Sequence, residues 1–347
     1  MKEINSSSLK TILHSKRASM FYIEHCRVLM NGGRVEYVTE EAKQSLYWNI
    51  PIANTTVILL GTGTSITQAA VRELAKAGVL IGFCGASGSP LFAGSEVVID
   101  IEFLASHSEY RPTKYCQAWM RLWLDDALRM NAAREFQEKR LDFIRKCWTS
   151  AAYKRDGFSI FEPELDSLIS GAKSRMAAAP TVNDILTEEA RMTKALYAMS
   201  AKASGYGSFT RAKLGSGEDP ANERLDHGNY LAYGLAGTAI WVLGIPSSLS
   251  IVHGKTRRGG LVFDVADLVK DALVLPLAFM SASKGEDDKT FRSRCIAAFA
   301  SAEALDLMIE QIQNVCDKVP VIAKTSTAPI TLSTQTDAVL PGFGDLQ

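Results

Sequence analysis

The chain of 347 residues contains few of the features that mark secreted, membrane-spanning or zinc-clustered proteins. Its six cysteines are scattered, and the closest two, Cys295 and Cys316, lie 21 positions apart. This spacing excludes Cys-x-x-Cys zinc and redox motifs and indicates reduced, mostly buried thiols. The N-terminus also lacks the basic start and apolar core of a secretory signal. We therefore expect a cytoplasmic protein.

Long apolar runs are equally scarce. The most apolar stretch, 231–245, has 15 residues and is interrupted by glycines, whereas a bilayer-spanning helix needs about 20. It is typical of a buried core helix, so we expect no contact with a membrane. With 25 glycines, 11 prolines and 47% hydrophobic residues, the chain is neither collagenous nor disordered, and its length predicts about two domains.

The chain carries no net charge, because 38 basic residues balance 38 acidic ones. The whole-molecule field therefore gives no reason to expect long-range attraction to a polyanion. The charge is unevenly placed, however, since residues 111–155 hold 11 basic and 5 acidic groups. This segment is either a solvated helix face or a surface that faces phosphates, and the sequence leaves both interpretations open.

Strand-like segments dominate the first 110 residues. Short aromatic and β-branched runs at 20–30 and 34–39 flank Asn31-Gly32-Gly33, which favours a tight hairpin turn. Further strands are expected at 57–60, 79–83 and 97–103, and apolar residues at helical spacing predict one helix at 65–77. We predict a β-rich N-terminal domain over residues 1–110.

Beyond Arg111-Pro112 the apolar residues recur with a period near 3.6, as in Trp119, Leu122 and Trp123. The same period recurs at 181–202, 221–243, 264–280 and 290–315. The sequence thus predicts an α+β protein with a larger, all-helical C-terminal domain over residues 111–324. Residues 325–347, rich in Thr, Ser, Pro and Gly, are expected to form a loosely held tail.

The first candidate for chemistry is Gly61-Thr62-Gly63-Thr64-Ser65, which follows an expected strand and precedes an expected helix. Such a glycine turn can hold a dinucleotide phosphate. The third glycine position is Ile66, however, and the next strand ends without the acidic residue that binds the ribose. We interpret the segment as a structural turn with a Thr or Ser cap.

The second candidate is Glu189, which shares a predicted buried helix stripe with Ile185 and Thr193. A carboxylate on a buried face is costly unless a cation or hydrogen-bond donors compensate its charge. An ion pair with a lysine or arginine from another helix is the simpler explanation, and a role as a ligand is the other.

The third candidate is a loop that begins at His253-Gly254 and contains Lys255, Arg257 and Arg258 before Gly259-Gly260. Glycines and fixed cations suit a phosphate. Asp264 and Asp267 follow at a spacing that places both carboxylates on one helix face. Asp264 could serve only as a helix N-cap. The density of imidazole, carboxylate and cationic groups instead favours a site for Mg²⁺ or Mn²⁺ and a phosphate.

Four separated motifs resemble the CRISPR-associated integrase family, the first universal adaptation protein. They are Glu189-Ala190-Arg191 with Leu196-Tyr197, Asp226-His227-Gly228-Asn229-Tyr230, His253-Gly254-Lys255 and Phe263-Asp264-Val265-Ala266-Asp267-Leu268. The N-terminal half, especially Ser45-Leu46-Tyr47-Trp48-Asn49-Ile50-Pro51, resembles members of subtype I-F. Ala190 stands where the broader family often has glycine.

The resemblance implies that Glu189, His253 and Asp267 are ligands of a divalent metal and that Asp264 is a further acidic residue needed near the site. It also implies a β-rich domain that forms a homodimer, and a second adaptation protein, fused in this subtype to the interference helicase-nuclease. The implied activity is insertion of short DNA fragments into a CRISPR array by attack of a 3′-hydroxyl on a phosphodiester, with nuclease activity on branched DNA. We expect Lys255, Arg257 and Arg258 to contact phosphates. The alternatives are a non-catalytic DNA-binding scaffold and a nucleotide-dependent enzyme that uses the Gly61 turn.

Overall fold

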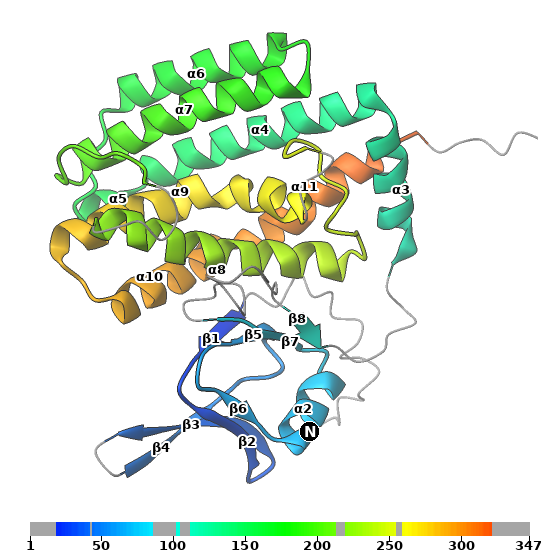
Figure 1. The fold of residues 1–347 in the computed structure, drawn as a ribbon, viewed down its shortest axis with the longest axis vertical. Helices are drawn as coiled ribbons and strands as arrows, with labels where there is room; N and C mark the ends of the chain where they lie inside the picture. The colour runs from blue at the N-terminus through cyan, green and yellow to red at the C-terminus, as the bar shows by residue number, and fades with distance from the viewer. Residues whose placement is uncertain are drawn as a thin grey trace, which may run out of the picture.

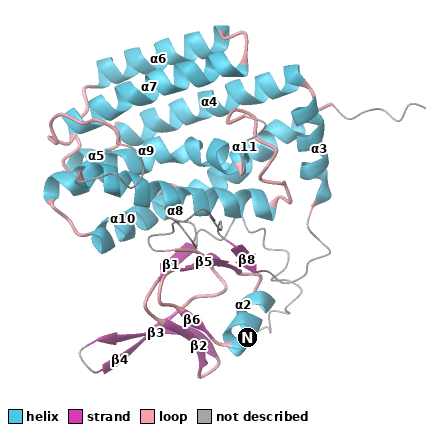
Figure 2. Ribbon diagram, viewed as in Figure 1, coloured by secondary structure: helices cyan, strands magenta, loops and turns pink. Residues whose placement is uncertain are grey.

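The computed structural model describes residues 19–41, 44–85, 102–104, 112–212, 219–254 and 259–320. Strands gather in the first part of the chain and helices fill the rest, as Figures 1 and 2 show. The predicted α+β class, with a β-rich N-terminal part and a larger helical C-terminal part, is thus confirmed. The domain limits at 110 and 324, and the tail at 325–347, lie outside the described residues.

Two four-stranded sheets form the N-terminal part. The first has the order β1-β5-β7-β8, parallel except for β8, and the second has the order β4-β3-β2-β6. The strands are β1 (Ser19–Ile23), β2 (Arg27–Asn31), β3 (Arg34–Glu41), β4 (Gln44–Asn49), β5 (Thr55–Leu60), β6 (Ser65–Ile66), β7 (Leu80–Phe83) and β8 (Glu102–Leu104), with helix α2 (Gln68–Lys76) between β6 and β7.

The predicted hairpin is present, since β2 pairs antiparallel with β3 and both Gly32 and Gly33 have positive φ. The single run expected at 20–30 is wrong, because it divides into β1 and β2, which belong to different sheets. The break lies at His25, whose φ is 49°. A left-handed residue turns the chain sharply, and alternation of side chains alone does not reveal it.

The interpretation of the Gly61 segment as a structural turn holds, but its expected cap does not. Ser65–Ile66 pairs with β2, and α2 starts later with Thr67 as its N-cap. The glycine turn therefore leads into a strand and not directly into the N-terminus of α2. A Cβ on Gly61 would lie 2.6 Å from the Tyr22 hydroxyl oxygen, so the side chain of β1 already fills the space beside this turn.

Strand β5 lies between two hydrophobic cores. Its Val57 and Leu59 side chains pack with the helical part, whereas Ile58 and Leu60 pack with residues of the second sheet and α2. All six residues of β5 are buried, as expected for a strand covered on both faces. The first sheet therefore joins the two parts of the molecule.

The helical part is built around the long helix α9, which packs along α8 and α4 (Figure 1). Most of its residues are buried, including three aspartates. The helices are α3 (Thr113–Leu124), α4 (Asp126–Trp148), α5 (Ala151–Arg155), α6 (Glu162–Ala178), α7 (Val182–Ala203), α8 (Pro220–Val242), α9 (Gly260–Lys284), α10 (Asp288–Ser301) and α11 (Ala304–Asp317). None of these described helices combines the length and apolarity needed to cross a bilayer.

Two helix predictions need correction. The helix expected at 290–315 is two helices, α10 and α11, separated near Glu303, whose φ is 51°. Helix α9 begins at Gly260, four residues before Asp264. Asp264 is therefore not an N-cap, and the pair with Asp267 lies beyond the first turn. The glycine-rich start misled the prediction, since glycine is a weak helix former.

Gly228 of α8 is a close-packing position. A Cβ added there would lie 2.4 Å from Val274 Cγ1 and 3.0 Å from Phe291 Cζ, so side chains of α9 and α10 leave no room for a methyl group. We expect Gly228→Ala to lower the free energy of unfolding by about 1–3 kcal/mol through overpacking, as measured by denaturant titration.

Gly171→Ala is the matched control, because its added Cβ would meet the flexible end of Arg175. Alanine there should leave stability unchanged or raise it by up to about 1 kcal/mol through helix propensity. Equal stability of Gly228→Ala and the original protein would contradict the packing described here.

Candidate metal centre

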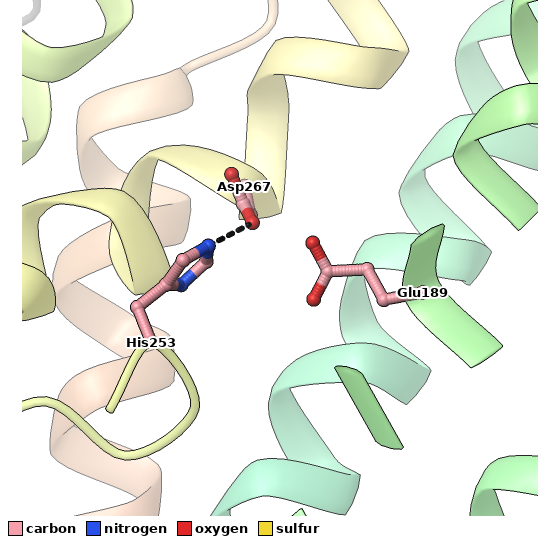
Figure 3. Close-up of side chains that lie close together, drawn as sticks. All are labelled: Glu189, His253 and Asp267. Carbon is pink, nitrogen blue, oxygen red and sulfur yellow. Dashed lines mark ion pairs between the residues drawn. The ribbon is translucent and has the colours of Figure 1, made fainter. Parts of the chain in front are cut away.

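Three side chains from distant parts of the sequence converge in the helical part. Glu189 lies on α7, His253 follows α8, and Asp267 lies on α9. One ligand atom from each can be chosen so that all lie within 4.8 Å of one another. Figure 3 shows the two carboxylates and the imidazole pointing toward a common space. Two carboxylates and one imidazole form a donor set that suits Mg²⁺ or Mn²⁺.

Of the two carboxylates, Asp267 is the one with the fewer hydrogen bonds in the described part of the chain. Its carboxylate is buried, and neither oxygen accepts a hydrogen bond within the described part of the chain. The Lys270 ammonium lies beside Oδ1, and His253 Nε2 lies 3.8 Å from Oδ2. Burial raises the pKa of Asp267 to about 6, with repulsion from Glu189 adding to it and Lys270 opposing it.

Glu189 is held by two side chains of α4. Gln137 Nε2 donates to Oε2 at 2.9 Å, and Arg140 Nη1 lies 3.0 Å from Oε1. Burial works against the ionised carboxylate, but the charges of Arg140, Lys270 and His253 outweigh it and lower the pKa of Glu189 to about 2. The predicted buried position of Glu189 is correct, and the ion pair with another helix is also present.

His253 is oriented by Asp264. Its Nδ1 lies 2.7 Å from Asp264 Oδ1, and its backbone N–H donates to the same oxygen at 3.1 Å. With the Nδ1 proton shared with a carboxylate, the Nε2 lone pair is free to face Asp267 and a ligand. Burial lowers the pKa of His253, but Asp264 and Asp267 outweigh it, so the pKa is raised above its ordinary value.

Asp264 also fixes the backbone that carries His253. Its Oδ2 accepts from the N–H groups of Ile251 at 2.7 Å and Val252 at 3.3 Å. Its side chain is fully buried, so every one of these bonds replaces water that the carboxylate has lost. Asp264 thus holds both the ring and the backbone of His253.

The sequence analysis missed the cations of this cluster. Arg140 contacts Glu189, Asp267 and Asp271, and Lys270 contacts Asp267. The available signal was spacing, since Lys270 and Asp271 follow Asp267 by three and four positions on one helix. Lys255, Arg257 and Arg258, the expected phosphate contacts, lie outside the described residues.

A small cavity borders this centre. It is lined by Gln137, Arg140, Val252, His253, Asp264 and Asp267 together with Phe136 and Leu268. The polar groups that face it come from α4, α9 and the loop before α9. His253 and Asp267 of the candidate centre therefore border this space, although the centre itself is mostly buried.

Comparison with known sequences identifies the family that this chain resembles. Residues 24–314 match the family of CRISPR associated protein Cas1. The chain is 57% identical to the CRISPR-associated endonuclease Cas1 of Pectobacterium atrosepticum, over 92% of this chain and 98% of that protein. It is 56% identical to the protein of the same name from Pseudomonas aeruginosa, over 93% of this chain and 100% of that protein.

Solved structures show the same fold. A TtCas1-DNA complex matches with a TM-score of 0.57 at 22% identity, over 94% of this chain and 98% of that one. A casposase bound to integration product matches with a TM-score of 0.64 at 14% identity, over 86% and 91%. A Cas6-RT-Cas1--Cas2 complex matches with a TM-score of 0.59 at 11% identity, over 87% of this chain and 35% of that one.

The resemblance noted in the sequence is therefore confirmed at the level of the family. The match extends over most of the chain, and two named endonucleases are more than half identical to it along nearly their whole lengths. The chain belongs to the CRISPR associated protein Cas1 family.

Proposed function

We propose that this protein is a divalent-metal-dependent DNA endonuclease and integrase of CRISPR adaptation. The observation that carries the proposal is the convergence of Glu189, His253 and Asp267 around a space where the Asp267 oxygens accept no hydrogen bond from the described residues. A buried carboxylate is costly unless cations and hydrogen bonds compensate its charge, and a divalent ion would add to the compensation that Lys270 and Arg140 give. Membership of a family whose relatives are named endonucleases supports the same function.

In this proposal, Glu189, His253 and Asp267 hold Mg²⁺ or Mn²⁺ and Asp264 holds His253. A bound divalent cation supplies positive charge that stabilises the developing charge on a phosphodiester oxygen. The bond that forms joins a 3′-hydroxyl oxygen of the incoming fragment to phosphorus. The bond that breaks releases a 3′-oxygen of the array strand, which takes up a proton, and the attacking hydroxyl gives its proton to solvent. Water in place of that hydroxyl gives endonuclease activity.

We also propose roles for three basic residues near the centre and for the partners of the protein. Lys255, Arg257 and Arg258 follow His253 directly in sequence, and we assign them phosphate contacts. A TtCas1-DNA complex, a casposase bound to integration product and a Cas6-RT-Cas1--Cas2 complex share the fold. They support DNA and a Cas2-type adaptation protein as partners. We further propose subtype I-F, with that protein fused to a helicase-nuclease, a homodimer formed by the β-rich residues 1–110, and a cytoplasmic location.

The proposed ligands can be tested against a neighbour on the same helix. Glu189→Gln or His253→Ala at saturating Mn²⁺ should reduce strand transfer at least about 100-fold, since each removes a proposed ligand. DNA affinity should stay within about threefold, because phosphate contacts dominate it. Glu188→Gln, which removes a partner of Arg175 outside the centre, should change neither. Undiminished strand transfer in both ligand variants would contradict the proposed catalytic role of this centre.

The basic loop has a quantitative signature in salt. Each of the variants Lys255→Ala, Arg257→Ala and Arg258→Ala should release one fewer counterion from DNA on binding. The slope of log affinity against log salt concentration should therefore decrease in magnitude by about one unit in each variant. Lys154→Ala, whose ammonium pairs with Glu162 on the surface, serves as the control. An unchanged slope in all three variants would rule out these phosphate contacts.

Metal binding should weaken in acid. A proton competes with the ion wherever the ligand pKa is raised, and the pKa of Asp267 lies near 6 while that of His253 is also raised. We expect the Mn²⁺ dissociation constant to rise about tenfold per pH unit per displaced proton, first as the pH falls through the raised pKa of His253 and then below 6, where Asp267 also takes up a proton. Electron paramagnetic resonance of free Mn²⁺ measures it. A constant affinity from pH 8 to pH 5 would contradict these ligands.

A further inference from the structure

The loop before α9 is fixed from two opposite sides. On one side, Asp264 accepts hydrogen bonds from the N–H groups of Ile251, Val252 and His253. On the other, two tryptophans of α3 donate to the preceding carbonyl groups. Trp119 Nε1 lies 2.8 Å from the Leu249 oxygen, and Trp123 Nε1 lies 2.9 Å from the Ser250 oxygen.

We propose that Trp119 and Trp123 are positioning residues that place His253 for metal binding. The inference rests on the proposed function, in which His253 is a ligand. Consecutive peptide groups are held by α3 through their carbonyl oxygens and by α9 through their N–H groups, so the backbone before His253 has little freedom to shift. The His253 imidazole is therefore held near the two carboxylates, and its loop does not have to become ordered when the metal binds.

Other contacts in the loop fit this role. Ser250 Oγ donates to the carbonyl oxygen of Gly254 at 2.6 Å. The Gly254 N–H donates to the carbonyl oxygen of Val252 at 2.9 Å, which closes a tight turn around His253. A Cβ on Gly260 would lie 2.8 Å from Ser250 Cβ, so α9 begins directly against the loop. These contacts fix the loop internally, and the two indole groups connect it to α3.

The two tryptophans are not equivalent as structural residues. Trp119 is fully buried and packs edge-on against Phe136 at 6.2 Å between ring centroids. Trp123 is half-buried. Its replacement by phenylalanine removes the N–H donor and keeps an aromatic ring, so Trp123→Phe is the variant in which loss of positioning is best separated from loss of folding.

The test measures Mn²⁺ affinity and catalysis separately. Loss of one hydrogen bond changes an equilibrium about threefold to tenfold. Trp123→Phe should therefore raise the Mn²⁺ dissociation constant about threefold to tenfold, while strand transfer at saturating Mn²⁺ stays within twofold. Leu124→Ala, exposed on the same helix, and Trp48→Phe, exposed on β4, are the controls. An unchanged Mn²⁺ affinity in folded Trp123→Phe overturns the inference.

A second measurement uses the original protein and does not depend on any variant's stability. The indole N–H signals of Trp119 and Trp123 should shift in nuclear magnetic resonance spectra when Mg²⁺ is added, and that of Trp48 should not. Absence of a shift at both loop-facing indoles overturns the inference. His253→Ala distinguishes failure of the proposed function from failure of this inference. If His253→Ala binds Mn²⁺ as tightly as the original protein, the proposed function fails. If His253→Ala loses Mn²⁺ affinity but Trp123→Phe does not, only the role of the tryptophans is rejected.

Discussion

The constraint on which this structure depends is the burial of carboxylates inside a helical bundle. Glu189, Asp264, Asp267 and Asp271 are all buried, and an ionised group without compensation is costly in such surroundings. Asp264 is held by His253 and three backbone N–H groups, whereas the other three carboxylates pair with Arg140. Burial disfavours the charge of Arg140, but Asp271, Glu189 and Asp267 outweigh this effect and raise its pKa. The cluster is therefore held together by charge as much as by packing, and it fixes how α4, α7 and α9 meet.

The sequence offered two explanations for the buried Glu189, an ion pair with another helix and a role as a metal ligand. An arginine from another helix does pair with it, yet the pairing leaves Asp267 with no hydrogen bond from the described residues. Arg140 and Gln137 hold Glu189 from α4, and Figure 3 shows the Glu189 carboxylate facing His253 and Asp267. An ion pair and a metal ligand are thus compatible roles for one carboxylate, because each of its oxygens has a second lone pair beside the one that faces Gln137 or Arg140.

His253 depends on more distant support than its sequence neighbours suggest. Its ring and backbone are held by Asp264, and its loop is also tied to α3, which lies more than a hundred residues earlier. The first sheet contacts the same helical core through Val57 and Leu59. The candidate centre is consequently supported by segments from α3 to α9, and no single motif contains it.

Much of this was accessible from sequence, since local periodicity reflects local physics. The helical stripe of Glu189, the hairpin at Gly32-Gly33 and the α+β order follow from side-chain spacing, which each short segment carries by itself. Side-chain spacing did not predict the breaks at His25 and Glu303, the start of α9 or the partners of Arg140. They depend on backbone angles and neighbours that only packing selects. The sequence by itself determined which residues could act as ligands, whereas the tertiary structure decided which of them meet, because convergence is a property of helix packing and not of spacing along the chain.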